Sequence, residues 1–212
     1  MLPRVSVFSL GGTIAMGAAA PGKGVSLSHT AEMLVAAVPA LADIAEIEAH
    51  SFRQLASPDI TLDDLEALAR EINQRLGDGV RGIVVTQGTD TLEESAFVID
   101  RLVQHDAPVV FTGAMRNPTM AGPNGPANLY HAVLVALDQQ TRGIGTLVVM
   151  SDEIHAARYV QKMHTTSPAA FHSSPAGAIG WIIEKQARIV TRPAGRHPVA
   201  LSAPPRAARV AR

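Results

Sequence analysis

The chain has 212 residues, enough for one domain with a substantial hydrophobic core and a short extension. Its 18 Lys and Arg residues nearly balance 19 Asp and Glu residues, so no net field would gather nucleic acid or an anionic membrane. Aromatic residues make up only 4% and cysteine is absent, which argues against base-stacking surfaces, disulfides and thiolate chemistry. A small neutral or zwitterionic ligand fits these limits, and we expect no nucleic-acid or membrane partner.

Short apolar, β-branched segments alternate with helical patterns along the chain, which is typical of a parallel sheet covered by helices. Strands are expected at about 4–9, 43–49, 82–86, 108–112 and 146–150, and helices at about 61–76, 91–104 and 126–138. In the clearest helix, Thr61 can cap, Asp64 lies in the first turn and Gly77 ends the pattern. We therefore predict an α/β, flavodoxin-like parallel sheet with helices on both faces, folded as a single domain.

Two long connections and a tail interrupt this alternation. Residues 16–30, MGAAAPGKGVSLSHT, are rich in Gly and Ala, so we expect a mobile loop that could close over a ligand as a lid. Residues 113–127 form a second long connection rich in Gly, Pro and Asn. We predict one domain over 1–190 and a linker-like or frayed tail over 191–212.

The N-terminus has some features of a secretion signal. MLPR precedes an apolar stretch, and GAAAPG offers small residues for cleavage. However, Gly11, Gly12 and Thr13 break the apolar stretch, and cleavage would remove the first strand together with Thr13. We therefore expect the segment to be retained and the protein to be cytoplasmic. No other stretch reaches the ~18 apolar residues that a membrane span needs.

Two predicted strands end in the same Gly-Thr pair. SLGGTIAM runs from the first strand into Thr13, and GIVVTQGTD runs from the third into Thr89 and Asp90. Because ligands bind at the carboxyl ends of strands in an open parallel sheet, we expect the two threonines to meet in one active site. A structural role, with glycines for tight turns and threonines as helix caps, explains one pair more easily than two. Neither stretch has the spacing of a phosphate-binding loop.

Four segments resemble consecutive motifs of the bacterial-type L-asparaginase and glutaminase-asparaginase family. They are SLGGTIAM, VVTQGTDTLEESAFVID, PVVFTGAMRNPTMAGPNGPANLYHAVLVAL and LVVMSDEIHAARYVQKMHTTSPAAFHS, in the family's order and with similar spacing. The resemblance runs from about residue 4 to about residue 197. It implies hydrolysis of the side-chain amide of L-asparagine, or of L-glutamine, with release of ammonia and without a cofactor.

The resemblance also implies catalytic roles. Thr13 matches the nucleophile that forms a threonine acyl-enzyme, and Thr89 matches a second catalytic threonine. Asp90 matches the carboxylate beside it, and Lys162, in VQKMHTTS, matches the lysine that supports Thr89. This set is chemically sensible, because an unassisted threonine hydroxyl is a poor nucleophile and needs a neighbouring base or polarising group.

A substrate-binding set follows from the same resemblance. Ser57, in QLASPDI, matches a residue that binds the α-carboxylate of the substrate, and Asp90 would also receive its α-ammonium. Gly88 and Thr89 complete the set, since N–H groups at the glycine turns could also stabilise an oxyanion. A metal site built from Asp152, Glu153 and His155, in SDEIHAAR, is the weaker alternative, because such loop clusters are usually solvated or capping.

The sequence departs from the family pattern at several positions. Residues 14–30 contain no tyrosine, where the family usually has one close to the nucleophile. Pro58 replaces the glutamine that commonly follows Ser57, Gln87 stands where histidine is frequent, and Asn124 stands where aspartate is frequent. Activation of the nucleophile and binding of the substrate are the functions that these changes affect.

Members of the family normally carry a second, smaller domain, which helps to complete the active site of a neighbouring subunit. Here the sequence ends soon after the similarity does, so we expect the usual second domain to be absent. We expect a homo-oligomer, either a dimer or a tetramer, that acts on an amino-acid amide. The alternative is a catalytically impaired asparaginase-like domain that serves as a binding or assembly protein.

Overall fold

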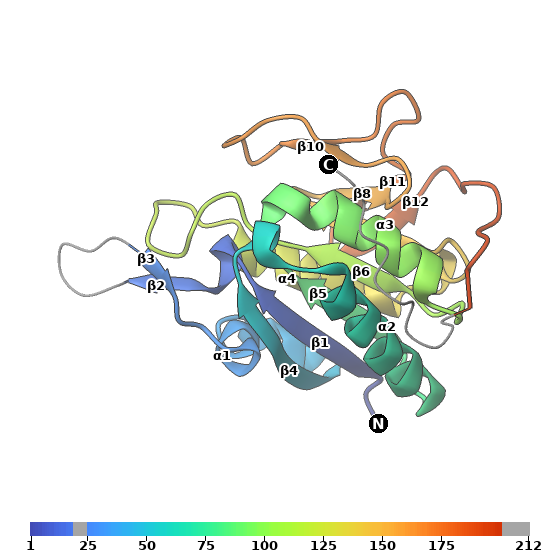
Figure 1. Cartoon of the computed structure of the whole chain (residues 1–212), viewed down its shortest axis with the longest axis horizontal. Coiled ribbons are helices and arrows are strands. Elements are labelled where there is room, and N and C mark those ends of the chain that lie inside the picture. The colour runs from blue at the N-terminus through green and yellow to red at the C-terminus, as the bar shows by residue number, and fades with distance from the viewer. Residues whose placement is uncertain (19–24, 201–212) are drawn as a thin grey trace.

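The computed structural model describes residues 1–18 and 25–200. Eight strands form its main sheet: β1 (Arg4–Gly11), β4 (Glu46–Leu55), β5 (Gly82–Thr86), β6 (Val109–Thr112), β7 (Thr146–Met150), β8 (Glu153–Ala156), β11 (Gly180–Ile183) and β12 (Gln186–Ile189). Their order across the sheet is β12-β11-β8-β7-β6-β5-β1-β4. Helices cover the sheet on both sides (Figure 1).

The five strands β1, β4, β5, β6 and β7 are parallel to one another. Taken in chain order they stand in the arrangement 2-1-3-4-5, which is the predicted flavodoxin-like order. Both β5 and β7 have the predicted bounds. β4 begins later and runs longer than the predicted 43–49, because a 3-10 helix at Pro39–Asp43 takes the expected start and the half-exposed edge strand continues through polar residues.

The remaining strands make the sheet mixed rather than fully parallel. β8, β11 and β12 are antiparallel to their neighbours and extend the sheet beyond β7. Ser151 and Asp152 have φ values of 50° and 67°, and Glu184 and Lys185 have 49° and 62°, as two-residue hairpin turns require. The α/β prediction with helices on both faces is confirmed, but these short strands were not anticipated.

In the described part of the chain, four α-helices pack on the sheet: α1 (Ala31–Ala36), α2 (Leu62–Gly77), α3 (Leu92–Leu102) and α4 (Gly125–Leu137). α2 begins with a capping box, in which the Thr61 hydroxyl accepts the N–H of Asp64 and the carboxylate of Asp64 accepts the N–H of Thr61. Gly77 is the last helical residue, and the left-handed turn that ends the helix lies at Gly79, with φ 86°. Among the helices of the described residues, none has the length and apolar character needed to cross a membrane.

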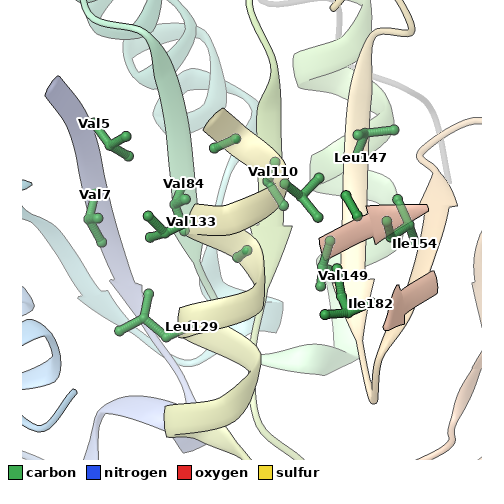
Figure 2. Close-up of a cluster of buried hydrophobic side chains, with 14 of the residues drawn as sticks. Val5, Val7, Val84, Val110, Leu129, Val133, Leu147, Val149, Ile154 and Ile182 are labelled. Carbon is green, nitrogen blue, oxygen red and sulfur yellow. The ribbon is translucent and has the colours of Figure 1, made fainter. Parts of the chain in front are cut away.

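The two faces of the sheet build two hydrophobic clusters, because successive strand side chains point to opposite sides. On one face α1 and α4 pack on the cluster of Val5, Val7, Val84 and Val110, and Figure 2 shows Leu129 and Val133 of α4 pointing into it. On the other face α2 and α3 cover a second cluster that contains Phe8, Ile83, Val85 and Phe111. All of these side chains are buried, so the strands that lead into the candidate site are held from both sides.

The predicted lid and tail are only partly among the described residues. Residues 16–18 and 25–27 form a two-stranded antiparallel sheet of β2 (Met16–Ala18) and β3 (Val25–Leu27), where only a loop was expected. Residues 19–24 of the predicted lid, and 201–212 of the predicted tail, lie outside the described residues. The described part of the tail has no regular secondary structure, yet hydrogen bonds from Arg192 and Arg196 hold it against the domain.

Candidate active site

The sheet order reverses between β1 and β5, and the candidate site lies at the carboxyl ends of these strands. From β1 the chain leaves toward β4 on one side, and from β5 it leaves toward β6 on the other. Such a reversal opens a crevice that side chains from both connections can reach. Thr13 begins the 3-10 helix η1 (Thr13–Ala15), and Thr89 begins η4 (Thr89–Thr91). Both threonines therefore lie at the edge where the sequence analysis expected them.

The glycine turn after β1 has a backbone that other residues rarely adopt. Gly11 and Gly12 have φ values of 105° and 83°, in the region that favours glycine. Gly12 also lies directly against the backbone of Gly88, with no room for a side chain between them. Because these glycines have no side chains, the Gly-Thr turn after β1 can lie against the Gly-Thr turn after β5.

Ser57 reaches the site from the end of β4, on the far side of β1. It begins the 3-10 helix η3 (Ser57–Asp59) and is 4% exposed. Its Oγ accepts a hydrogen bond from the backbone N–H of Asp90 at 3.2 Å. Because that oxygen is already an acceptor, the hydroxyl hydrogen of Ser57 can be donated to a ligand in the cavity.

Lys162 enters from outside the main sheet. It lies in β9 (Gln161–Lys162), which pairs with β10 (Phe171–His172). Its Nζ donates to Thr89 Oγ1 at 2.9 Å and to Asp90 Oδ1 at 2.5 Å. The lysine side chain is 13% exposed while that of Asp90 is 67% exposed, so the cation is enclosed and its carboxylate partner stays accessible to solvent. A charge-assisted group of this kind holds the Thr89 hydroxyl in one orientation.

The predicted site residues line a single cavity of about 170 Å³. Those that the sequence analysis named are Thr13, Ser57, Gly88, Thr89, Asp90 and Lys162. Pro58 also lines it and offers neither a backbone N–H nor a polar side chain. Asn124 lies outside the cavity, where its Oδ1 accepts the N–H groups of Met115 and Arg116 and so shapes the loop after β6.

Three residues near the site were not singled out by the sequence analysis as contributors. The carboxylate of Glu93 accepts a hydrogen bond from the backbone N–H of Lys162. Thr91 donates from Oγ1 to the carbonyl oxygen of Ser57 at 2.7 Å. Gln87, noted earlier only as a departure from the family pattern, is fully buried and donates to the Thr91 hydroxyl. The motif TDTLEES contains Thr91 and Glu93, but only the fold shows that they reach segments more than thirty residues away.

The acidic cluster considered as a metal site divides between two histidines. Asp152 Oδ1 lies 2.9 Å from His131 Nδ1, whereas Glu153 Oε2 lies 3.3 Å from His155 Nε2. Burial lowers the pKa of both histidines, and the neighbouring carboxylates partly oppose that shift. Within residues 1–18 and 25–200, no three His, Asp or Glu side chains gather in a way that could hold a metal ion.

Known proteins resemble this chain over most of its length. A family model described as Asparaginase, N-terminal, matches residues 4–195. L-asparaginase 2 of Bacillus subtilis is 42% identical over 189 residues, which cover 86% of this chain and 50% of the relative. L-asparaginase 2 of Escherichia coli is 38% identical over 201 residues, which cover 92% of this chain and 57% of the relative.

A solved structure shows the same fold. The crystal structure of a probable cytoplasmic L-asparaginase from Campylobacter jejuni matches with a TM-score of 0.83 at 31% identity, covering 90% of this chain and 57% of that chain. The chain therefore spans about half the length of the curated relatives it matches. The family match over residues 4–195, together with this partial coverage of the relatives, shows that the chain belongs to the asparaginase family and corresponds to its N-terminal domain.

Proposed function

We propose that this chain is an amidohydrolase that releases ammonia from the side-chain amide of L-asparagine and, as a second substrate, L-glutamine. The observation that carries the proposal is the hydrogen-bonded group of Lys162, Thr89 and Asp90 in the same cavity as Thr13. Membership in the family supports an amino-acid amide as the substrate. The glutaminase-asparaginase of Pseudomonas fluorescens, 39% identical over 207 residues, supports including the longer amide.

In the proposed reaction, the Thr13 hydroxyl oxygen attacks the amide carbon of the substrate. The Lys162 ammonium gives a proton to the leaving nitrogen and takes one from the Thr89 hydroxyl, which takes the hydroxyl proton of Thr13, so ammonia departs and an ester with Thr13 remains. Water then attacks the ester carbon, Thr13 regains a proton and the free acid is released. Threonine needs such assistance, because its hydroxyl is a weak nucleophile at neutral pH. The enclosed ammonium of Lys162 also stabilises negative charge that develops nearby.

The two charged ends of the substrate have matching groups in the cavity. The hydroxyl hydrogen of Ser57 is available to the α-carboxylate, since its oxygen already accepts the N–H of Asp90. The exposed carboxylate of Asp90 is available to the α-ammonium. Charge-assisted hydrogen bonds at these two ends would fix the orientation of the substrate and so hold its side-chain amide against Thr13.

Ammonia release by the purified chain, measured with L-asparagine and with L-glutamine, tests the proposal. We expect turnover with L-asparagine that Thr13→Ala abolishes. The alternative, a domain that binds or assembles without catalysis, predicts that L-aspartate binds to the wild-type chain but that neither amide releases ammonia. That result would overturn the amidohydrolase proposal.

We also propose that residues 1–20 are retained and that the protein is cytoplasmic. β1 is paired on both sides, with β4 and with β5, and its residues from Val5 to Gly11 are buried. Removing residues 1–20 would therefore take out an inner strand of the sheet as well as Thr13. An intact-mass measurement on the protein from its native cell tests this, and a mature chain that lacks these residues would contradict it.

The oligomeric state is a further part of the proposal. The carboxylate of Asp90, which is offered to the α-ammonium of the substrate, is 67% exposed, so a side chain of a neighbouring copy could reach it. We propose a homo-oligomer, a dimer or a tetramer. Sedimentation velocity at several concentrations of the chain tests this, and a monomer that retains full activity would contradict it.

A further inference from the structure

Ser57 and Thr89 lie on connections that are not neighbours in the sheet. Ser57 follows β4, Thr89 follows β5, and β1 lies between these two strands. The distance between the two side chains is therefore not set by strand pairing. Two hydrogen bonds join the connections: the N–H of Asp90 donates to Ser57 Oγ at 3.2 Å, and Thr91 Oγ1 donates to the carbonyl oxygen of Ser57 at 2.7 Å.

The Thr91 hydroxyl donates a hydrogen bond to Ser57 and makes none with its own helix. Thr91 occupies the N-cap position of α3, where a threonine hydroxyl ordinarily accepts an N–H from the first turn of the helix. Here the side chain makes no capping hydrogen bond, and its hydroxyl is directed to Ser57 instead. The Thr91 hydroxyl therefore links the start of α3 to a segment 34 residues away in the sequence and does not cap its own helix.

Gln87 fixes the direction of the Thr91 hydroxyl. Its Nε2 lies 3.3 Å from Thr91 Oγ1 and 3.0 Å from Ser95 Oγ, and the side chain is fully buried at the end of β5. An amide nitrogen can only donate, so Thr91 accepts from Gln87 and has its own hydrogen left for Ser57. The side chains of Gln87 and Thr91 and the backbone carbonyl of Ser57 form a directional series of hydrogen bonds from the end of β5 to the end of β4.

We propose that Thr91, oriented by Gln87, is a positioning residue that holds Ser57 in place for the carboxylate of the substrate. This inference rests on the proposed function, because it assigns Thr91 an effect on the group that Ser57 binds. It goes beyond that function by predicting that a side chain outside the cavity lining controls affinity at the carboxylate end and has little influence on the chemistry at Thr13.

Thr91→Val and Thr91→Ser form the matched pair that tests the assignment. Valine keeps the shape and removes the hydroxyl, so we expect the KM for L-asparagine to rise about five- to tenfold, with kcat within about threefold of wild type. Serine keeps the hydroxyl and should restore the wild-type KM. Ser95→Ala is the control, because it removes the other acceptor of the Gln87 amide and leaves the contact with Ser57 intact.

A second ligand separates positioning from general damage. 3-Aminopropanamide carries the amide and an ammonium group and lacks the α-carboxylate. Its inhibition constant should be the same in wild type and Thr91→Val, whereas the dissociation constant of L-aspartate should rise with the KM. If Thr91→Val fails the folding check by circular dichroism, Gln87→Met replaces it and should raise the KM about threefold by loosening the same hydroxyl.

The possible outcomes are distinct. An unchanged KM in Thr91→Val, equal impairment in Thr91→Ser, or a parallel change for 3-aminopropanamide would overturn the assignment in an active enzyme. If the wild-type chain neither releases ammonia nor binds L-aspartate, the proposed function is wrong and the assignment falls with it.

Discussion

Gly12 and Gly88 touch through their backbones: a Cβ atom added to Gly12 would lie 2.1 Å from the backbone nitrogen of Gly88. A Cβ added to Gly88 would in turn lie 2.9 Å from Ser57 Oγ and 3.2 Å from the Cα of Gly12. Three connections, after β1, β4 and β5, therefore meet at one point. The glycines have a packing role here, which is distinct from the chemistry of the threonines that follow them.

Gly12→Ala should destabilise the chain by at least about 2 kcal/mol, because it combines a left-handed backbone with a clash against backbone atoms that cannot move aside. Urea unfolding followed by circular dichroism measures the change. Gly77→Ala is the control: it lies at the end of α2 with nothing within 4 Å of an added Cβ, so it should stabilise the chain by about 0.5–1 kcal/mol. Equal stability of Gly12→Ala and wild type would contradict the packing role.

Thr13→Ala and Thr89→Val should each reduce ammonia release at least about a hundredfold while the circular dichroism spectrum stays unchanged. The first removes the proposed nucleophile, and the second removes the hydroxyl that accepts from Lys162 Nζ. Initial rates at saturating L-asparagine measure the effect. Near-normal turnover in either variant would show that the role given to that threonine is wrong.

Glu93→Ala should lower kcat about tenfold, because the backbone N–H of Lys162 loses its acceptor and Nζ is then held less well against Thr89. Glu94→Ala is a matched control. Both glutamates lie in the first turn of α3 and contribute similarly to the helix dipole, but Glu94 is exposed. Equal rates for the two variants would mean that the contact with Glu93 does not position the lysine.

The pH dependence of stability should report on Asp64. The Nε of Arg53 donates to its carboxylate at 2.7 Å, and this bond, with those from Thr61, lowers the pKa of Asp64 from 3.8 to about 2. The folded state thus binds this proton less readily than the unfolded state. The stabilisation is complete above pH 3.8 and is lost as the pH falls through about 2.

Asp64→Asn should therefore lower the free energy of unfolding by about 1 kcal/mol at pH 6, through the weakened cap and ion pair. The difference from wild type should shrink as the pH approaches 2. Urea titrations at a series of pH values give both numbers. A difference that stays constant across this range would show that the charge of Asp64 is not the source of its effect.

The inner parallel strands were predictable because they are buried on both faces and have continuous runs of apolar residues. GIVVT and TLVVM have the predicted bounds for this reason. The edge strand β4 is half exposed and carries polar residues, so its extent is hidden in the sequence. The hairpin strands β8, β11 and β12 are only four residues long, and their turns use non-glycine residues at positive φ, which gives little local signal.

In the site, too, the residues that directly follow buried strands were predictable, and those that depend on long-range contacts were not. Thr13 and Thr89 follow buried strands directly, so strand order alone brings them to one edge of the sheet. The acceptor for the backbone of Lys162 is 69 residues away at Glu93, and the acceptor for the Thr91 hydroxyl is 34 residues away at Ser57. Such contacts depend on how the connections fold over the sheet, which no local pattern in the sequence encodes.

Arg196 ties the described part of the predicted tail to the end of α3. Its guanidinium donates to the carbonyl oxygens of Asp100, Val103 and His105 at 2.9, 2.6 and 2.7 Å. Its Nε lies 3.8 Å from the carboxylate of Asp100, which in turn accepts the N–H of Thr146 at the start of β7. These carbonyls at and just beyond the last turn of α3 have no partner within that helix, so the arginine caps the helix from a distance.

Arg196→Ala should destabilise the chain by about 2–4 kcal/mol, because it leaves these carbonyls without a donor and the buried Asp100 with a weaker counter-charge. Arg196→Lys should recover only part of this, since a single ammonium cannot reach three carbonyls in the geometry of the planar guanidinium. Arg188→Ala, on the exposed side of β12, should change stability by less than about 0.5 kcal/mol. Urea unfolding of the three variants tests this: if Arg196→Ala and Arg188→Ala unfold at the same midpoint, the contacts of Arg196 with the end of α3 do not stabilise the fold.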